Sequence, residues 1–292
     1  MPLVPWKKGV VDVMFKTKIM SEEDFEFAIR VTDEMNWDLS EWDFKFTMQL
    51  EPQGCFVLLD DSEKVGLAMA VTYGKLGWIG NVIVSECCRK KGAGSFLVKH
   101  CVDYLKGRGA ETVGLYAYLE RINFYQRLGL KYDSEFAVLK GTGFSSEGKP
   151  DVKSAEKTDW EKIAEFDASC FGGSRRNLLE SILTDRDNSC YILAREGQMS
   201  GYLAAKVYGE TADVGPLMVR QGQTDPAISL LEAMFDGLRG VEVSMCIPQK
   251  ETAILQLLKQ HGFDEKFRVA RMFLGVPISW NCIYAAESLE RG

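Results

Sequence analysis

The residues from Val82 to Ser95 carry the groups that bind a pyrophosphate. An apolar strand with Val82, Ile83 and Val84 runs into a turn that contains three cations and two glycines, in the order Arg89-Lys90-Lys91-Gly92-Ala93-Gly94-Ser95. Glycine has no side chain, so a phosphate can approach the backbone there, and the first amides of the helix predicted over residues 96–106 have no partner within that helix. The stretch therefore predicts an anion site at a helix start.

Two other phosphate-binding patterns are absent from the sequence. It contains no Gly-x-x-x-x-Gly-Lys-Ser/Thr, which excludes a nucleoside-triphosphate loop, and no Gly-x-Gly-x-x-Gly of a dinucleotide site. A strand-to-helix connection with solubilising lysines is the structural alternative for this turn.

A second motif follows about 30 residues later, in which a helical tyrosine precedes a Leu-Gly turn: Asn123-Phe124-Tyr125-Gln126-Arg127-Leu128-Gly129-Leu130. The first motif, Val-(four residues)-Arg-x-x-Gly-x-Gly, resembles the acetyl-coenzyme A motif of the GNAT (Gcn5-related) N-acetyltransferases. The second resembles that family's other signature, and the two come in the family's order.

The resemblance implies an α/β (α+β) GNAT fold, a mixed and mostly antiparallel sheet flanked by helices, with acetyl-CoA as cosubstrate. It assigns the phosphates to residues 89–95 and the amides of pantetheine to Val82, Ile83 and Val84, next to a splay between strands. Tyr125 would be the general acid that protonates the thiolate of coenzyme A, and a core tyrosine is the alternative. Asn123 would contact the cofactor, although the family's commoner asparagine lies seven residues before the tyrosine, where this chain has Tyr118.

The acceptor amine must lose a proton before it attacks the thioester, and the sequence does not identify the base. Many relatives place an acid on the cofactor strand, where this chain has Gly80 and Asn81. Carboxylates at Glu41, Asp43 and Glu86 are candidates, with solvated or structural charges as the alternative. Two roles are equally open for Trp37, Trp42 and Trp78: an aromatic wall of the acceptor pocket, or packing in the core. The candidates for the acceptor side are Trp37, Trp42, Asp43 and Asn81.

The first half of the chain reads as helices and strands in the order that this fold requires. Ser21-Glu22-Glu23-Asp24 predicts a capping box for a helix that runs toward Glu34. The other expected elements are a helix over 40–50, strands over 55–59, 65–72 and 78–84, the helix after the glycine turn, a strand over 112–116, a helix over 121–128 and a strand over 130–140.

The same order of elements returns after residues 141–153, which have no hydrophobic period and read as a linker. We expect helices over 159–170 and 175–183, strands over 190–195, 201–207 and 214–219, a helix over 227–238, a strand over 242–247 and a helix over 251–260. The counterpart of the phosphate turn, residues 219–226, has one glycine and an aspartate, Asp225. The sequence thus predicts two tandem GNAT-like domains: a catalytic domain over 1–145 that binds acetyl-CoA, and a degenerate accessory domain over 146–292.

Composition narrows the class of protein. The chain has 292 residues and a net charge of −7, which argues against a nucleic-acid partner. It has no apolar run long enough for a bilayer and no signal-peptide pattern, so we expect a cytoplasmic protein with no membrane partner. The eight cysteines lack Cys-x-x-Cys spacing and read as reduced packing residues, and two histidines argue against a metal site.

The function predicted from these features is acetyl-CoA-dependent N-acetyl transfer by direct attack of an amine in a ternary complex. The acceptor would be a small-molecule or peptide amine, and a homodimer stays open. The alternatives are a non-catalytic sensor that binds acyl-CoA and a structural protein made of two inactive domains.

Overall fold

The computed structural model describes residues 15–37, 39–146, 150–195, 198–276, 278 and 282–292. The chain forms two compact units. The first comprises residues up to Met69 together with Asn81–Cys101, and the second comprises Ala70–Gly80 and Val102–Gly292. Strands β3 (Glu63–Tyr73) and β4 (Leu76–Val84) and helix α3 (Ala93–Gly107) contribute residues to both units.

In the first unit, two helices pack on a short antiparallel sheet. Strand β2 (Cys55–Asp60) pairs with β1 (Phe15–Ile19) on one side and with β3 on the other. Helices α1 (Phe25–Asp33) and α2 (Glu41–Leu50) place phenylalanines on the same apolar core as the sheet. The capping box predicted at Ser21 is present, with Asp24 at η1 (Glu22–Asp24), and α2 begins with a second box, Ser40 with Asp43.

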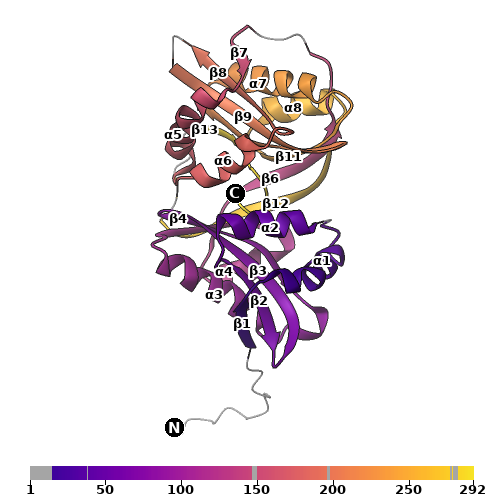
Figure 1. Ribbon diagram of the computed structural model, residues 1–292, viewed down its shortest axis with the longest axis vertical. Coiled ribbons are helices and arrows are strands. Elements are labelled where there is room, and N and C mark those ends of the chain that lie inside the picture. Colours follow the sequence, from indigo (N-terminus) through magenta and orange to yellow (C-terminus); the bar gives the residue numbers. More distant parts are fainter. Residues whose placement is uncertain (1–14, 38, 147–149, 196–197, 277, 279–281) are drawn as a thin grey trace, which may run out of the picture. The chain divides into compact units, whose positions relative to one another are not determined.

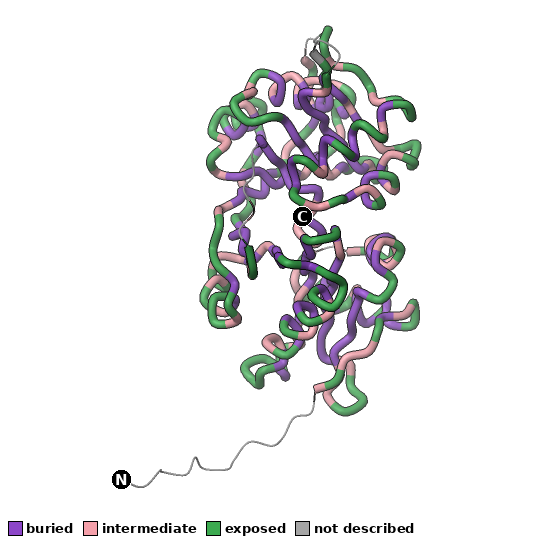
Figure 2. Tube along the Cα trace, turned by 90° about the vertical axis from the view of Figure 1, so that its left-hand side faces the viewer, coloured by how far each residue is buried: buried purple, intermediate pink, exposed green. Residues whose placement is uncertain are grey.

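The second unit is built on a long sheet that is mostly antiparallel. From the start of β4 its strands follow the order β5 (Thr112–Tyr118), β12 (Asp264–Gly275), β6 (Lys131–Thr142), β11 (Glu242–Pro248), β10 (Thr211–Arg220), β9 (Gln198–Tyr208), β8 (Ser189–Arg195) and β7 (Val152–Ser154). Strand β13 (Cys282–Ala285) pairs with β10. The helices of this unit are α4 (Ile122–Arg127), α5 (Trp160–Phe171), α6 (Arg176–Thr184), α7 (Thr224–Gly237) and α8 (Thr252–Gln260). Buried residues run along its strands, and exposed ones gather at turns (Figure 2).

The two halves of the sequence exchange a strand within this unit. Strand β6, from the first half, pairs with β11 of the second half, and β12, from the second half, pairs with β5 of the first. The exchanged strands also pair with each other in antiparallel fashion (Figure 1). Neither half therefore completes its sheet with its own last long strand.

Most elements predicted from the sequence are present, and some were missed. Strands β1, β7, β12 and β13 were not predicted, and β7 lies partly in the expected linker, of which residues 147–149 lie outside the described residues. The expectation that all cysteines are reduced is wrong for Cys170 and Cys282, which form a disulfide. The two cysteines are 112 positions apart, a separation that no local spacing reveals. No described helix combines the length and apolar character needed to cross a bilayer.

The buried carboxylate of Asp24 predicts a pH dependence of stability. Its side chain is inaccessible and pairs with the ammonium groups of Lys18 at 2.8 Å and Lys64 at 2.5 Å. Burial alone would raise the pKa of this carboxyl, but the two lysines and the Ser21 amide outweigh burial and lower the pKa from 3.8 to about 2. The folded-state pKa is depressed, so this stabilisation is present above pH 3.8 and is lost as the pH falls toward 2.

We therefore expect Asp24→Asn to reduce the free energy of unfolding at pH 7 by about 2–3 kcal/mol. The difference from wild type should shrink toward zero near pH 2, as followed by denaturant unfolding across that range. The exposed Asp33→Asn, at the end of the following helix α1, is the matched control. An Asp24→Asn deficit that stays constant with pH would contradict the ion-pair origin.

A second buried ion pair holds the start of α6. The side chains of Arg175 and Asp167 are both inaccessible, with Nη2 and Oδ2 at 2.6 Å, and the Tyr202 hydroxyl donates to the same carboxylate. The neighbouring Arg176 pairs with Glu161 at the surface. Replacing Arg175 leaves a buried carboxylate without its cation, which is strongly destabilising, whereas an exposed pair contributes little.

Arg175→Met should lower the free energy of unfolding by about 3–5 kcal/mol, and Arg176→Met by about 1 kcal/mol or less. Denaturant titration of both variants measures the contrast. Equal losses in the two variants would show that burial of the pair does not decide its contribution.

Candidate active site

The glycine turn leads from β4 through η2 (Glu86–Cys88) into the N-terminus of α3. Lys90 has φ +63° and Gly92 φ +90°, so the chain turns sharply there through backbone conformations that favour glycine. The helical ladder begins with the Phe96 amide, which donates to the Gly92 carbonyl at 3.0 Å. The amides of Ala93, Gly94 and Ser95 precede that ladder and form the N-terminal donors of a 15-residue helix.

The space in front of this turn is open toward solvent. A Cβ built on Gly92 would meet no atom within 4 Å, so a side chain there would fill the approach to the amides and not the protein interior. Lys90, Lys91 and Gly92 are exposed, whereas Ala93 is buried under the helix start. The Nε of Arg89 donates to the Val84 carbonyl at 2.9 Å and ties the turn to the end of β4. The geometry fits an anion held by backbone amides with Lys90 and Lys91 beside it.

The three strand residues predicted to hold pantetheine lie after an irregularity in β4. The strand is parallel to β5 from Leu76 to Ile79. Asn81 then takes φ +50°, a left-handed conformation that interrupts a regular strand. Among the described residues of the first unit, β3 is the only strand beside Val82, Ile83 and Val84, so their other edge has no strand of that unit. Free strand edges can pair with an extended amide group.

The second half repeats this arrangement with a strand of its own in the equivalent place. Strand β10 is parallel to β11 only from Thr211 to Asp213. The register then shifts at Gly215-Pro216, and from Leu217 to Arg220 β10 pairs with β13 instead. The Ala286 amide, directly after β13, donates to the Cys246 carbonyl of β11 at 3.0 Å. Strand β13 thus fills the splay between β10 and β11, the counterpart of the splay predicted beside β4.

The counterpart of the phosphate turn is also different in chemistry. Gly222 has φ +80° and open space around it, as Gly92 has, but a single cation, Arg220, precedes it in the turn, and Asp225 lies in the first turn of α7. A carboxylate at a helix N-terminus favours the helix itself and repels a phosphate.

Tyr125 and Asn123 lie in the second unit, on α4, whereas the other predicted site residues lie in the first unit. Tyr125 is 8% exposed, and its ring contacts Phe124 edge to face, with the centroids 4.9 Å apart. Its carbonyl accepts the amides of Leu128 and Leu130, which forms the turn that the Leu-Gly motif predicts. Asn123 is exposed on the same helix.

The residues proposed for the acceptor side have structural contacts. Asp43 accepts the amide and hydroxyl of Ser40 in the capping box, and Glu41 pairs with Lys45 at 3.2 Å. Trp42 is 39% exposed and stacks on Phe46, and Trp37 is half-buried against the core of the first unit. Asn81 is buried, and its amide nitrogen lies 3.4 Å from the Met69 sulfur. The two remaining candidates differ in burial. Trp78 is a fully buried core residue, and Glu86 is exposed.

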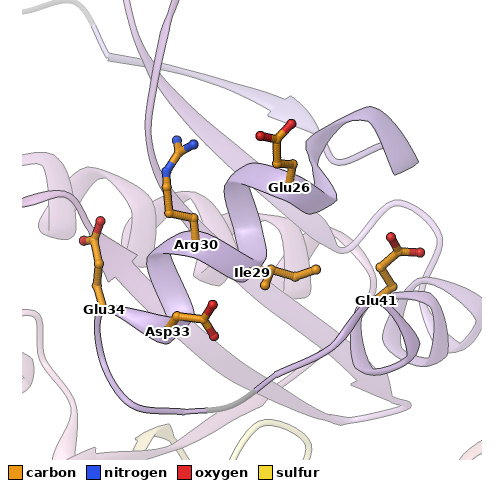
Figure 3. A pocket seen from close by; sticks show the side chains of 6 residues that line it. All are labelled: Glu26, Ile29, Arg30, Asp33, Glu34 and Glu41. Atoms are coloured by element: carbon orange, nitrogen blue, oxygen red, sulfur yellow. The ribbon is translucent and has the colours of Figure 1, made fainter.

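A pocket of about 520 Å³ lies on the outer face of α1, next to the start of α2 (Figure 3). Its lining carries four carboxylates, one guanidinium and one apolar side chain: Glu26, Asp33, Glu34, Glu41, Arg30 and Ile29. This excess of negative charge favours cations over anions at this face. No group of three or more His, Cys, Asp or Glu side chains among the described residues is arranged to hold a metal.

Sequence reasoning missed the kink at Asn81 and the strand that fills the second splay. The Gly215-Pro216 pair, inside an otherwise apolar strand, was a usable signal, because proline cannot donate to a ladder. Strand β13 has only four residues and gave no pattern of its own.

The chain matches two sequence models of known families. The "Acetyltransferase (GNAT) family" matches residues 17–130, and the "Acetyltransferase (GNAT) domain" matches residues 163–285. The prediction of two tandem GNAT domains is confirmed.

Similar proteins support the same assignment along the whole chain. The uncharacterized N-acetyltransferase YitH of Bacillus subtilis is 24% identical, over 97% of this chain and 99% of the relative. The holothin acyltransferase of a Pseudoalteromonas species is 22% identical, with 94% of each chain covered. A solved structure from Pyrococcus horikoshii, assigned to the acetyltransferases, superposes with a TM-score of 0.79 at 19% identity over 99% of both chains. The chain therefore belongs to the GNAT acetyltransferase superfamily, in tandem form, and is an acyltransferase.

Proposed function

We propose that the protein is an N-acetyltransferase that uses acetyl-CoA and has one cofactor site per chain, in the first half. The observation that carries the proposal is the contrast between two equivalent places in the fold. Beside β4 the glycine turn has left-handed residues, open space and exposed lysines. Beside β10 the corresponding strand edge is paired with β13.

The chemistry follows from the residues at the first place. The pyrophosphate binds the amides at the start of α3, with Lys90 and Lys91 beside them. The amide groups of the pantetheine arm pair with the edge of β4 at Val82, Ile83 and Val84. The neutral amine of the acceptor attacks the thioester carbonyl directly, the C–S bond breaks, and Tyr125 protonates the departing thiolate. The nitrogen then loses one proton to solvent, and the Tyr125 phenolate takes one back. Asn123 is assigned a contact with the cofactor, and the acceptor is a small-molecule or peptide amine.

The second half is proposed to be an accessory domain that holds no coenzyme A. Its splay is occupied by β13, and Asp225 lies in the first turn of α7, where the first half has no carboxylate. We assign residues 1–145 to the catalytic domain and 146–292 to the accessory domain, with β6 and β12 exchanged between them.

Paired substitutions test the cofactor site. Gly92→Glu with Gly94→Glu places two carboxylates in front of the amides of α3, so affinity for acetyl-CoA should fall at least about 100-fold. Calorimetric titration measures the affinity. Gly222→Glu is the matched control, because Gly222 has a similar positive φ and the same open surroundings. Loss of affinity in the control, or its retention in the double variant, would contradict the assignment.

Tyr125→Phe removes the proposed proton donor and keeps the ring. We expect kcat for acetyl transfer to fall by about 100-fold or more, with the affinity for acetyl-CoA unchanged. Tyr132→Phe, on the exposed side of β6, is the control. Free thiol released from acetyl-CoA across a panel of amines gives the rates. An unchanged kcat would remove Tyr125 from the reaction, and no turnover with any amine would favour a module that only binds acyl-CoA.

A further inference from the structure

The thiols of Cys87 and Cys88 lie side by side directly before the glycine turn. Their sulfurs are 3.7 Å apart on η2, and the next residue is Arg89. Cys87 is exposed and free, whereas the other free cysteines among the described residues are buried: Cys55, Cys88, Cys101, Cys190 and Cys246. The pair therefore combines an accessible thiol with a second thiol within reach of it.

The two thiols have different surroundings. Cys88 is 3% exposed, and its sulfur lies 3.6 Å from Oδ2 of Asp60, to which it donates. Burial, followed by the neighbouring Cys87 and Asp60, raises the pKa of the Cys88 thiol. Cys88 is thus held as a protonated thiol, and Cys87 is the thiol that solvent-borne reagents meet first.

We propose that Cys87 and Cys88 form a thiol–disulfide exchange site that controls binding at the adjacent turn; the second part of this inference rests on the proposed function. The Cys87 thiolate attacks a low-molecular-weight disulfide, forms a mixed disulfide and releases one thiol. The Cys88 sulfur then attacks the Cys87 sulfur as its proton passes to the departing sulfur, so the Cys87–Cys88 bond forms and the second thiol is released. Two electrons pass from the cysteine pair to the small disulfide, and the two protons of the pair end on the two released thiols.

Oxidation of this pair has to move the backbone of the turn. A disulfide bond is about 2.05 Å long and needs a specific dihedral geometry, whereas these sulfurs sit on consecutive residues of a 3₁₀ turn. That turn is held by the Cys88 amide to the Ser85 carbonyl at 3.0 Å and by the Arg89 amide to the Glu86 carbonyl at 3.1 Å. Formation of the S–S bond strains both of these hydrogen bonds and displaces Arg89, which anchors the turn on Val84. The oxidised protein therefore presents a distorted anion site.

The test uses the full chain, reduced and then exposed to glutathione disulfide. Trypsin cleaves after Lys75 and after Arg89, so both cysteines are found in one peptide, residues 76–89. We expect this peptide to lose the mass of two hydrogens and the affinity for acetyl-CoA to fall at least about tenfold by calorimetry, with both changes reversed by dithiothreitol. Cys88→Ser should stop at the mixed disulfide.

The double variant Cys87→Ser/Cys88→Ser is the control, because it keeps Cys170 and Cys282 and should show neither change. Unchanged affinity after oxidation of the pair, or an equal loss in the double variant, would overturn the inference. If the reduced wild type binds no acetyl-CoA, the proposed function fails, and the mass change still reports on the exchange site by itself.

Discussion

Hydrogen bonding along a buried strand edge is the constraint on which this structure depends. Backbone amides and carbonyls that are removed from water need partners, and a strand that separates from its neighbour loses them. In each half a strand runs parallel to the next for a few residues and then changes its backbone course, at Asn81 in β4 and at Gly215-Pro216 in β10. Beyond that point the edge needs a new partner. In the second half the chain supplies one, β13.

The two halves share a topology but differ in what pairs with this strand edge. A strand of the protein itself is a permanent partner, so the edge of β10 has no need of a ligand. The exchange of β6 and β12 adds a second consequence, because each half completes its sheet with a strand from the other. The accessory half is therefore part of the framework that holds β5, and removing it would leave β5 without its antiparallel neighbour β12. The buried pairs of Asp167 with Arg175 and of Glu287 with Lys206 and Arg291 hold the same framework in place.

Most of the fold could be predicted because it is set by signals that lie within a few residues of each other in the sequence. The capping boxes at Ser21 and Ser40 set helix starts, Gly92 marks the turn that precedes α3, and Gly94 lies in the first turn of that helix. The features that depend on distant partners could not be read in this way. Strand β13 forms by pairing with the edge of β10, and the Cys170–Cys282 bond joins residues 112 positions apart. The motif identified Arg89 as a site residue, but only the structure showed its bond to the Val84 carbonyl.

Hydrogen–deuterium exchange with and without acetyl-CoA tests the central claim, that one half binds the cofactor and the other fills the same place with its own strand. Amides that become hydrogen-bonded to a ligand exchange more slowly, whereas amides that are already paired change little. The account predicts slower exchange in peptides that cover residues 82–96, and no change in peptides that cover 217–226 and 282–285. New protection at residues 217–226, or none at 82–96, would contradict it.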